Sequence, residues 1–111
     1  MATVEKAVLG TFLKNNYLLK DTILRPKHFE EEQNKRLFTE MQKLVKQGKG
    51  VDVVTLSTTS TLSELGGVSY LNDIQSFANV EKFEDYEAII LEKWKEREKK
   101  NILNTASFED W

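Results

Sequence analysis

The sequence predicts an all-α fold, a compact bundle of about six helices in which the last helix is long and extends outward. Apolar residues recur at steps of three or four through most of the chain, the spacing of helices with one buried face. The 111 residues contain one Pro and five Gly, which argues against a disordered or linker-rich chain. Residues 83–103 contain neither and are rich in Glu, Lys, Leu and Ile, which favour helix.

Composition favours a binding module over an enzyme. With 40% hydrophobic and 31% charged residues, the chain is one small globular domain. The absence of Cys excludes disulfides and thiolate metal sites, and one His leaves no room for a His-pair metal site or a His-relayed dyad. We expect no catalytic, cofactor-binding or metal-ligating residue. No long apolar run is present, so no membrane partner is expected, and the net charge of −2 is unlike that of nucleic-acid binders.

Two helices are expected before Pro26. Thr3 is predicted to cap the first helix, with Glu5 near its positive end. Asn16 is predicted to cap a short second helix through Leu24, which ends because the residue before a Pro is pushed out of the helical region. The first helix has an apolar stripe of Val4, Ala7, Val8, Leu9, Phe12 and Leu13. The predicted buried residues of the second helix are Tyr17, Leu18, Ile23 and Leu24.

A third helix is predicted over residues 31–47, followed by Gly48 at the position after the helix end. Acidic residues lie in its first turn and lysines in its last, which suits the helix dipole. We expect His28, just before this helix, to be a surface or capping residue and not a catalyst. The apolar stripe of the helix contains Leu37, Phe38, Met41, Leu44 and Val45.

A short fourth helix is predicted over residues 53–57, with Asp52 as its N-cap. The β-branched residues of 51–55 are equally compatible with a strand, but a lone strand would have no partner, so helix is preferred. The hydroxyl residues 57–61 are interpreted as a solvated helix end or loop, and not as a nucleophile or a phosphorylation site.

A fifth helix follows the break at Gly66-Gly67, and a turn centred on Asn79 leads into the last helix. The apolar residues of the fifth helix are Val68, Leu71, Ile74, Phe77 and Ala78. The stripe of the last helix contains Phe83, Tyr86, Ile90 and Trp94. From 92 to 100 every residue except Trp94 is charged. Glu and Lys or Arg alternate there at helix-pairing distances, which indicates a solvated helix face before a DNA-binding patch.

Seven short motifs then suggest a family. In order, they are Ala-Val-Leu-Gly (7–10), Leu-Arg-Pro-x-x-Phe (24–29), Leu-Phe-x-x-Met-x-x-Leu (37–44), Val-Asp-Val-Val-Thr-Leu (51–56), Leu-Gly-Gly-Val-Ser-Tyr-Leu (65–71), Ala-Asn-Val-Glu (78–81) and Tyr-x-x-Ile-Ile (86–90). Each motif alone is made of ordinary core and turn residues. In this order and spacing, over about residues 4–103, they resemble the N-terminal domain of the DnaB-type replicative DNA helicases of bacteria and their phages.

The resemblance implies a domain layout: residues 1–82 as the globular bundle, 83–104 as a long helix forming the first arm of a helical hairpin, and 105–111 as the start of a truncated connection. In that family such hairpins pair between subunits, and six domains form a collar of three dimers. The ATPase motor that uses ATP and Mg²⁺ lies in a separate C-terminal domain. The second arm is absent here, so oligomerisation through the hairpin is not expected of this chain alone.

The resemblance also implies partners and a location. They are the primase C-terminal domain, a helicase loader and other helicase subunits, with DNA bound only through the full ring, in the cytoplasm of a bacterium or a phage-infected host. Residues 57–61 depart from the usual charged helix of the family and are expected to be looser. Two further hypotheses stay open at this stage: a free-standing adaptor or inhibitor that mimics the domain, and a small helical DNA-binding module.

Partner contacts are expected on apolar side chains of the last helix where it leaves the core. The candidates are Tyr86, Trp94, Ile102 and Leu103. For Trp94 an equally good interpretation is that its ring seals the bottom of the bundle.

Overall fold

The computed structural model describes the chain at residues 2–59 and 61–109, with side chains at 3–59 and 61–101. The described residues contain helices and turns and no strand, which confirms the all-α expectation. The α-helices are α1 (Ala2–Lys14), α2 (Leu18–Asp21), α3 (Glu32–Lys46), α4 (Val53–Ser57), α5 (Gly67–Gln75) and α6 (Phe83–Glu109). Three short 3₁₀ turns join them: η1 (Pro26–His28), η2 (Leu62–Leu65) and η3 (Val80–Lys82).

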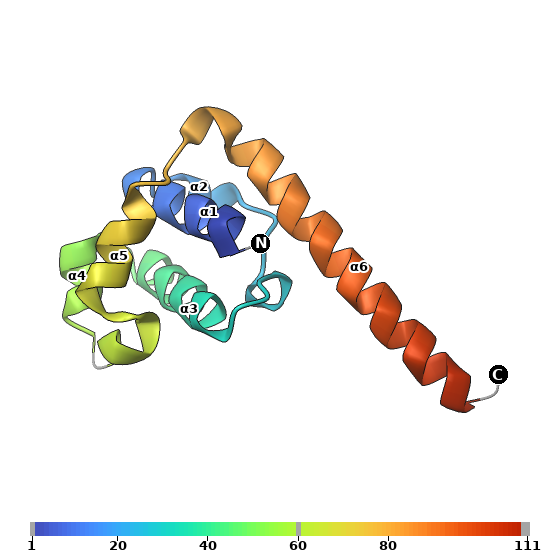
Figure 1. The fold of residues 1–111 in the computed structure, drawn as a ribbon. Coiled ribbons are helices and arrows are strands. Elements are labelled where there is room, and N and C mark those ends of the chain that lie inside the picture. Colours follow the sequence, from blue (N-terminus) through green and yellow to red (C-terminus); the bar gives the residue numbers. More distant parts are fainter. Residues whose placement is uncertain (1, 60, 110–111) are drawn as a thin grey trace.

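The long helix α6 lies along one side of the bundle and continues beyond it (Figure 1). On the other side of α1, helices α4 and α5 cover the end of the bundle farthest from the tip of α6 (Figure 1). None of the described helices combines the length and apolar composition that a membrane crossing needs.

The core is organised around Phe12 of α1. Its ring stacks on Phe38 of α3 with centroids 5.5 Å apart and meets the edge of Phe83 of α6 at 5.2 Å. Phe38 in turn contacts Phe29, which follows η1, at 5.1 Å. Each fully buried ring or aliphatic side chain stabilises the fold by about 1.5–3 kcal/mol, so this cluster joins the first, middle and last thirds of the chain.

Helix α2 differs most from its prediction. It is a single turn, and the chain becomes extended at Thr22 (φ −67°, ψ 141°). Tyr17 and Ile23, predicted to be buried, are 58% and 62% exposed, whereas Leu24 is fully buried as expected. The helical period assumed through Leu24 does not apply once the backbone straightens, so every second side chain changes face.

Asn16 does not cap α2, because Tyr17 occupies the cap position. Its side chain instead joins α1 to the loop before α4. The Asn16 amide nitrogen donates to the carbonyl of Val51 at 2.8 Å, and the Val51 N–H donates back to the Asn16 Oδ1 at 2.8 Å. A second bond from the same amide, to the carbonyl of Phe12 at 2.8 Å, closes the end of α1.

The remaining helix boundaries agree closely with expectation. Asp52 caps α4 by accepting from the Thr55 N–H at 2.7 Å, and Gly48 takes the left-handed conformation (φ 74°) after α3. Thr3 does not act as the cap of α1, since the helix begins at Ala2. Two residues of the predicted fifth stripe, Val68 and Phe77, are exposed, and Phe77 lies beyond the end of α5.

Helix α6 is fixed at its start and then runs farther than predicted. The buried Thr11 hydroxyl of α1 accepts from the Asn79 N–H at 2.9 Å, and Asn79 caps η3 by accepting from the Lys82 N–H. The predicted boundary at 104, with a connection over 105–111, is not where the helix ends: α6 continues to Glu109. No Gly or Pro lies between 83 and 109, so nothing in the local sequence stops the helix.

Helices α1 and α5 approach each other at Gly10. A Cβ built on Gly10 would lie 1.8 Å from the carbonyl oxygen of Ile74, near the end of α5. That oxygen belongs to the backbone and cannot swing away, so a larger residue would push the two helices apart. Only Gly permits this spacing.

We predict that Gly10→Ala lowers the free energy of unfolding by about 1–3 kcal/mol, although Ala is preferred in helices by about 1 kcal/mol. Urea denaturation followed by circular dichroism measures the change. Gly50→Ala is the control, because the nearest atom to its added Cβ is 3.9 Å away. Equal stability of the two variants would contradict the close approach of α1 and α5.

Candidate interaction site at the base of α6

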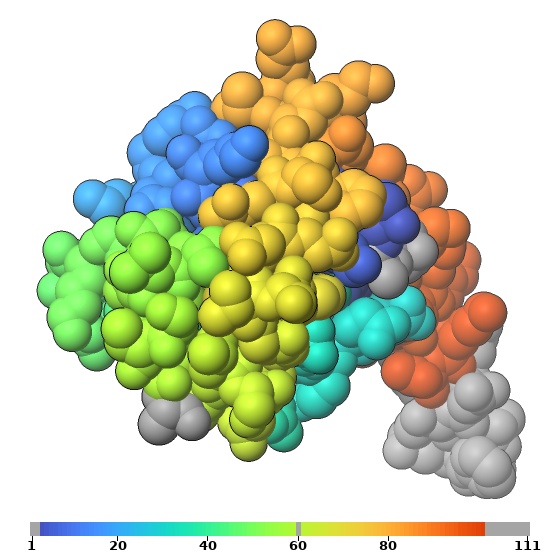
Figure 2. Space-filling model, turned by 60° about the vertical axis from the view of Figure 1, so that its left-hand side comes forward, coloured from blue at the N-terminus to red at the C-terminus, as the bar shows by residue number. Residues whose placement is uncertain are grey.

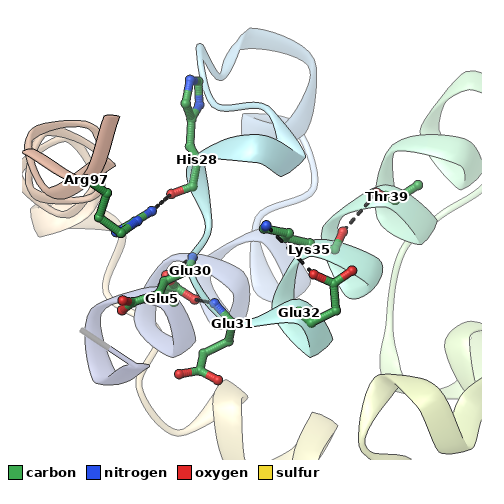
Figure 3. Close-up of polar contacts among 8 residues, drawn as sticks. All are labelled: Glu5, His28, Glu30, Glu31, Glu32, Lys35, Thr39 and Arg97. Atoms are coloured by element: carbon green, nitrogen blue, oxygen red, sulfur yellow. Dashed lines mark hydrogen bonds and ion pairs between the residues drawn. The ribbon is translucent and has the colours of Figure 1, made fainter. Parts of the chain in front are cut away.

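The last described contacts between α6 and the bundle are made by Trp94 and Arg97. The Trp94 ring meets the His28 ring edge-on with centroids 4.7 Å apart, and the Lys27 ammonium lies 5.1 Å from the centre of the indole. The Arg97 guanidinium donates to the carbonyl of His28 at 3.0 Å (Figure 3). We call these four residues the α6 junction, because the helix leaves the bundle there.

The loop that follows the junction is held from α1. The Glu5 carboxylate, 1% exposed, accepts from the Glu30 N–H at 2.7 Å and from the Glu31 N–H at 3.4 Å (Figure 3). It also accepts from the Asn34 amide at 2.8 Å. Glu31 precedes α3 and makes no side-chain cap of its own, so a residue of α1 supplies the cap that α3 lacks.

A polar chain continues from Glu5 to α5. The Asn34 Oδ1 accepts from the Tyr70 hydroxyl, so Glu5, Asn34 and Tyr70 link α1, α3 and α5. Burial raises the pKa of the Tyr70 phenol, and its hydrogen bonds to Gln33 and Asn34 oppose part of that rise. The phenol therefore stays protonated at neutral pH and keeps donating.

His28 combines a buried ring with a capping role. The expected capping function is confirmed, since its Nδ1 accepts from the Arg25 N–H at 2.8 Å across η1. The expected surface position is wrong, because the residue is only 7% exposed beneath Trp94. Burial lowers the pKa of His28, and the positive charges of Lys27 and Arg25 lower it further.

The four predicted contact residues fall into three situations. Tyr86 is half-buried and packs against the core, and Trp94 belongs to the α6 junction. The side chains of Ile102 and Leu103 lie outside the described residues. Sequence reasoning missed Arg97, which looked like one charge in a solvated run, and it read Glu5 as a first-turn acid of α1.

The described side chains contain no group of three or more His, Asp or Glu placed to hold a metal ion. A bundle that fixes the direction of one long helix is the architecture of a domain that presents a surface to other chains. The family model of the DnaB-like helicase N terminal domain matches residues 1–92. The chain belongs to this family, which confirms the resemblance found in its motifs.

Two relatives agree with this assignment. The chain is 38% identical over 96 residues to the replicative DNA helicase DnaC of Bacillus subtilis (strain 168), covering 80% of this chain and 21% of the relative. It is 36% identical over 89 residues to the replicative DNA helicase DnaB of Geobacillus stearothermophilus, covering 71% and 20%. The chain therefore spans about a fifth of the length of these relatives.

Solved structures share the fold. The crystal structure of the N-terminal domain of DnaB helicase from Mycobacterium tuberculosis superimposes with a TM-score of 0.79 at 26% identity, over 87% of this chain and 75% of that one. A DnaB-like replicative helicase, described with its interactions with primase, superimposes with a TM-score of 0.83 at 24% identity, over 98% of this chain and 28% of that one.

We predict that Glu5→Gln lowers the free energy of unfolding by about 1.5–3 kcal/mol. A Gln amide keeps the size but turns one acceptor into a donor, which then faces the N–H groups of Glu30, Glu31 or Asn34. Urea denaturation measures the loss. Glu31→Gln removes an exposed carboxylate close to the same helix end, so it corrects for the helix dipole and should change stability little. Similar losses in both variants would show that burial of Glu5 is not the cause.

We predict that His28 makes stability depend on pH. Its folded pKa lies below the ordinary value of 6.5, so between the two values the unfolded chain binds more protons. Its contribution is complete above about 6.5 and is lost as the pH falls through the folded pKa. His28→Asn keeps an acceptor for Arg25 without titrating there, so wild type should lose more stability than this variant between about pH 7 and 5. Parallel pH profiles, or a His28 pKa above 6.5 by NMR, would refute this.

Proposed function

We propose that this chain acts as the non-catalytic N-terminal domain of a replicative DNA helicase, where it scaffolds assembly of the ring and docks protein partners. The family match over residues 1–92 carries the proposal. The relatives with 38% and 36% identity are replicative DNA helicases, and each is about five times as long as the match. In the parent protein, ATP and Mg²⁺ would be bound by a separate motor domain.

The geometry of α6 supports a scaffolding role. Phe83 and Ile90 are buried in the core, and Arg97 makes a further contact at the junction, so the helix is held along much of its length before it projects. A helix held in this way can transmit the position of the bundle to a neighbouring chain. We propose that it is the first arm of a helical hairpin through which subunits pair, as a trimer of dimers in the ring.

Partner contacts are proposed on α6 itself. Tyr86 and Trp94 are half-buried and would contribute their remaining exposed edges, and Ile102 and Leu103 would pack against the second arm. The contacts of Trp94 with His28 and Lys27 favour a sealing role for most of its ring.

The proposed partners are the C-terminal domain of primase, a helicase loader and other subunits of the same helicase. A structural neighbour of this chain is described with its interactions with primase, which supports the first of these. DNA would be bound only through the assembled ring, in a bacterial or phage-infected cytoplasm. The net charge of −2 supports a protein partner over DNA for the isolated domain.

The experiment compares this chain with one extended by about forty residues, enough for a turn and a second arm as long as α6. Light scattering should show the chain monomeric and the extended chain dimeric or larger. Calorimetry should show binding of the primase C-terminal domain from the same host to the extended chain. An extended chain that stays monomeric and ignores primase would overturn the proposal.

Ile102→Ser in the extended chain is expected to weaken its self-association, and Lys99→Ser is the control on the same helix. A free-standing adaptor or inhibitor would instead block assembly of the host helicase and lack a motor domain in its reading frame. That outcome would replace the scaffolding role.

A further inference from the structure

Two neighbouring hollows lie between α2 and the end of α3, away from the α6 junction. Their volumes are about 360 Å³ and 250 Å³, and both are lined by Lys20 and Val45. In Figure 2 the blue segment that contains α2 lies directly against the green segment that contains the end of α3. We call the combined surface the lysine groove. Its principal residues are Tyr17, Leu19, Lys20, Val45, Lys46 and Lys49.

The lysine groove is positively charged without internal compensation. None of the described residues that line the two hollows is acidic. Among the described residues, no ion pair involves Lys20, Lys46 or Lys49. This concentration of positive charge is notable in a chain whose net charge is −2.

A third hollow provides a comparison. It measures about 460 Å³ and also lies along α3, but acidic and basic residues both line it. Its charges are paired: Arg36 contacts Glu64 at 3.3 Å, and Lys43 contacts Glu40 at 3.3 Å. That hollow is electrostatically satisfied, whereas the lysine groove is not.

The lysine groove also offers apolar surface. Leu19 is buried and Val45 is half-buried between the lysines, and Tyr17 stands 58% exposed at the edge. Tyr17 makes no cap contact for α2, so its side chain is free of that structural duty. An aromatic ring beside lysine stems gives a surface for an apolar side chain.

The wall of the lysine groove is preformed. Gly48 and Gly50 line it without side chains, and the paired Asn16–Val51 hydrogen bonds hold this loop against the end of α1. Gly48 can adopt its φ of 74° without strain. A site that is already built loses less entropy on binding.

We propose that the lysine groove docks an acidic linear segment of a partner protein, in which carboxylates flank one apolar side chain. The carboxylates would pair with Lys20, Lys46 and Lys49, and the apolar side chain would lie on Val45 beside Tyr17. This site is independent of the proposed pairing through α6. A peptide fits better than a nucleic acid, because the floor is apolar, no Arg is present to grip a phosphate with two bonds, and the whole chain would repel a polyanion.

The probe is a fluorescein-labelled nine-residue peptide with four acidic residues on each side of one leucine. Fluorescence polarisation at physiological salt measures its affinity for this chain. The variant Lys20→Gln/Lys46→Gln/Lys49→Gln should weaken binding at least about tenfold, as loss of three partly exposed ion pairs implies. Tyr17→Ala, and a peptide with serine in place of leucine, should each weaken binding severalfold.

The control variant Lys95→Gln/Lys99→Gln/Lys100→Gln removes the same charge from α6 and should change affinity less than about twofold. Amide NMR shifts on peptide binding should fall within 16–20 and 44–51.

Three results would overturn the proposal. The first is no binding by wild type, or an equal loss in the two triple variants, which would mean non-specific attraction. The second is tighter binding of single-stranded DNA with the same NMR shifts, which would assign the groove to nucleic acid. The third is a concentration-dependent dimer with those shifts, which would assign it to a second copy of the chain.

Discussion

The fold depends on a buried carboxylate that finds its partners in another helix. Burying a carboxylate costs several kcal/mol unless hydrogen bonds replace the lost water. Glu5 meets that condition with two backbone N–H groups at the start of α3 and the amide of Asn34. The same three bonds cap a helix that has no local cap, so α1 and α3 are stable only in this relative position. A single residue thereby sets the geometry of the bundle.

That geometry reaches the surface through the loop after η1. Glu5 holds residues 30–31 from inside, and Arg97 holds the carbonyl of His28 from the α6 side (Figure 3). The direction of α6 is thus tied to the start of α3 and through Glu5 to α1. In a domain of the DnaB-like helicase N-terminal family, this connection gives a physical means by which a projecting helix can report on the bundle, and the reverse. The lysine groove lies elsewhere, at the ends of α1, α2 and α3, and is built by a different polar contact, that of Asn16 with Val51.

Most helices could be predicted because their signals are local. The stripe of α3, the Asp52 cap of α4 and the Gly48 position all depend on residues within a turn of each other. Tyr17 and Ile23 were misplaced because a period of 3.6 was carried past the point where the backbone becomes extended at Thr22. The site was less predictable: Trp94 was identified, but Arg97 sits in a run of charges whose pattern is the same whether or not one of them reaches a carbonyl of another element.

The sequence by itself determined the helical class, the main breaks between helices and the family, because apolar periodicity, glycine breaks and ordered motifs are written along the chain. Only the tertiary structure decided what the polar residues do. Glu5 looked like an acid at the start of its own helix and caps another, and Asn16 looked like a cap and instead clasps a loop 35 residues away. The physical reason is that a hydrogen bond needs its partner at about 3 Å, and for these residues the partner is brought near only when the helices pack.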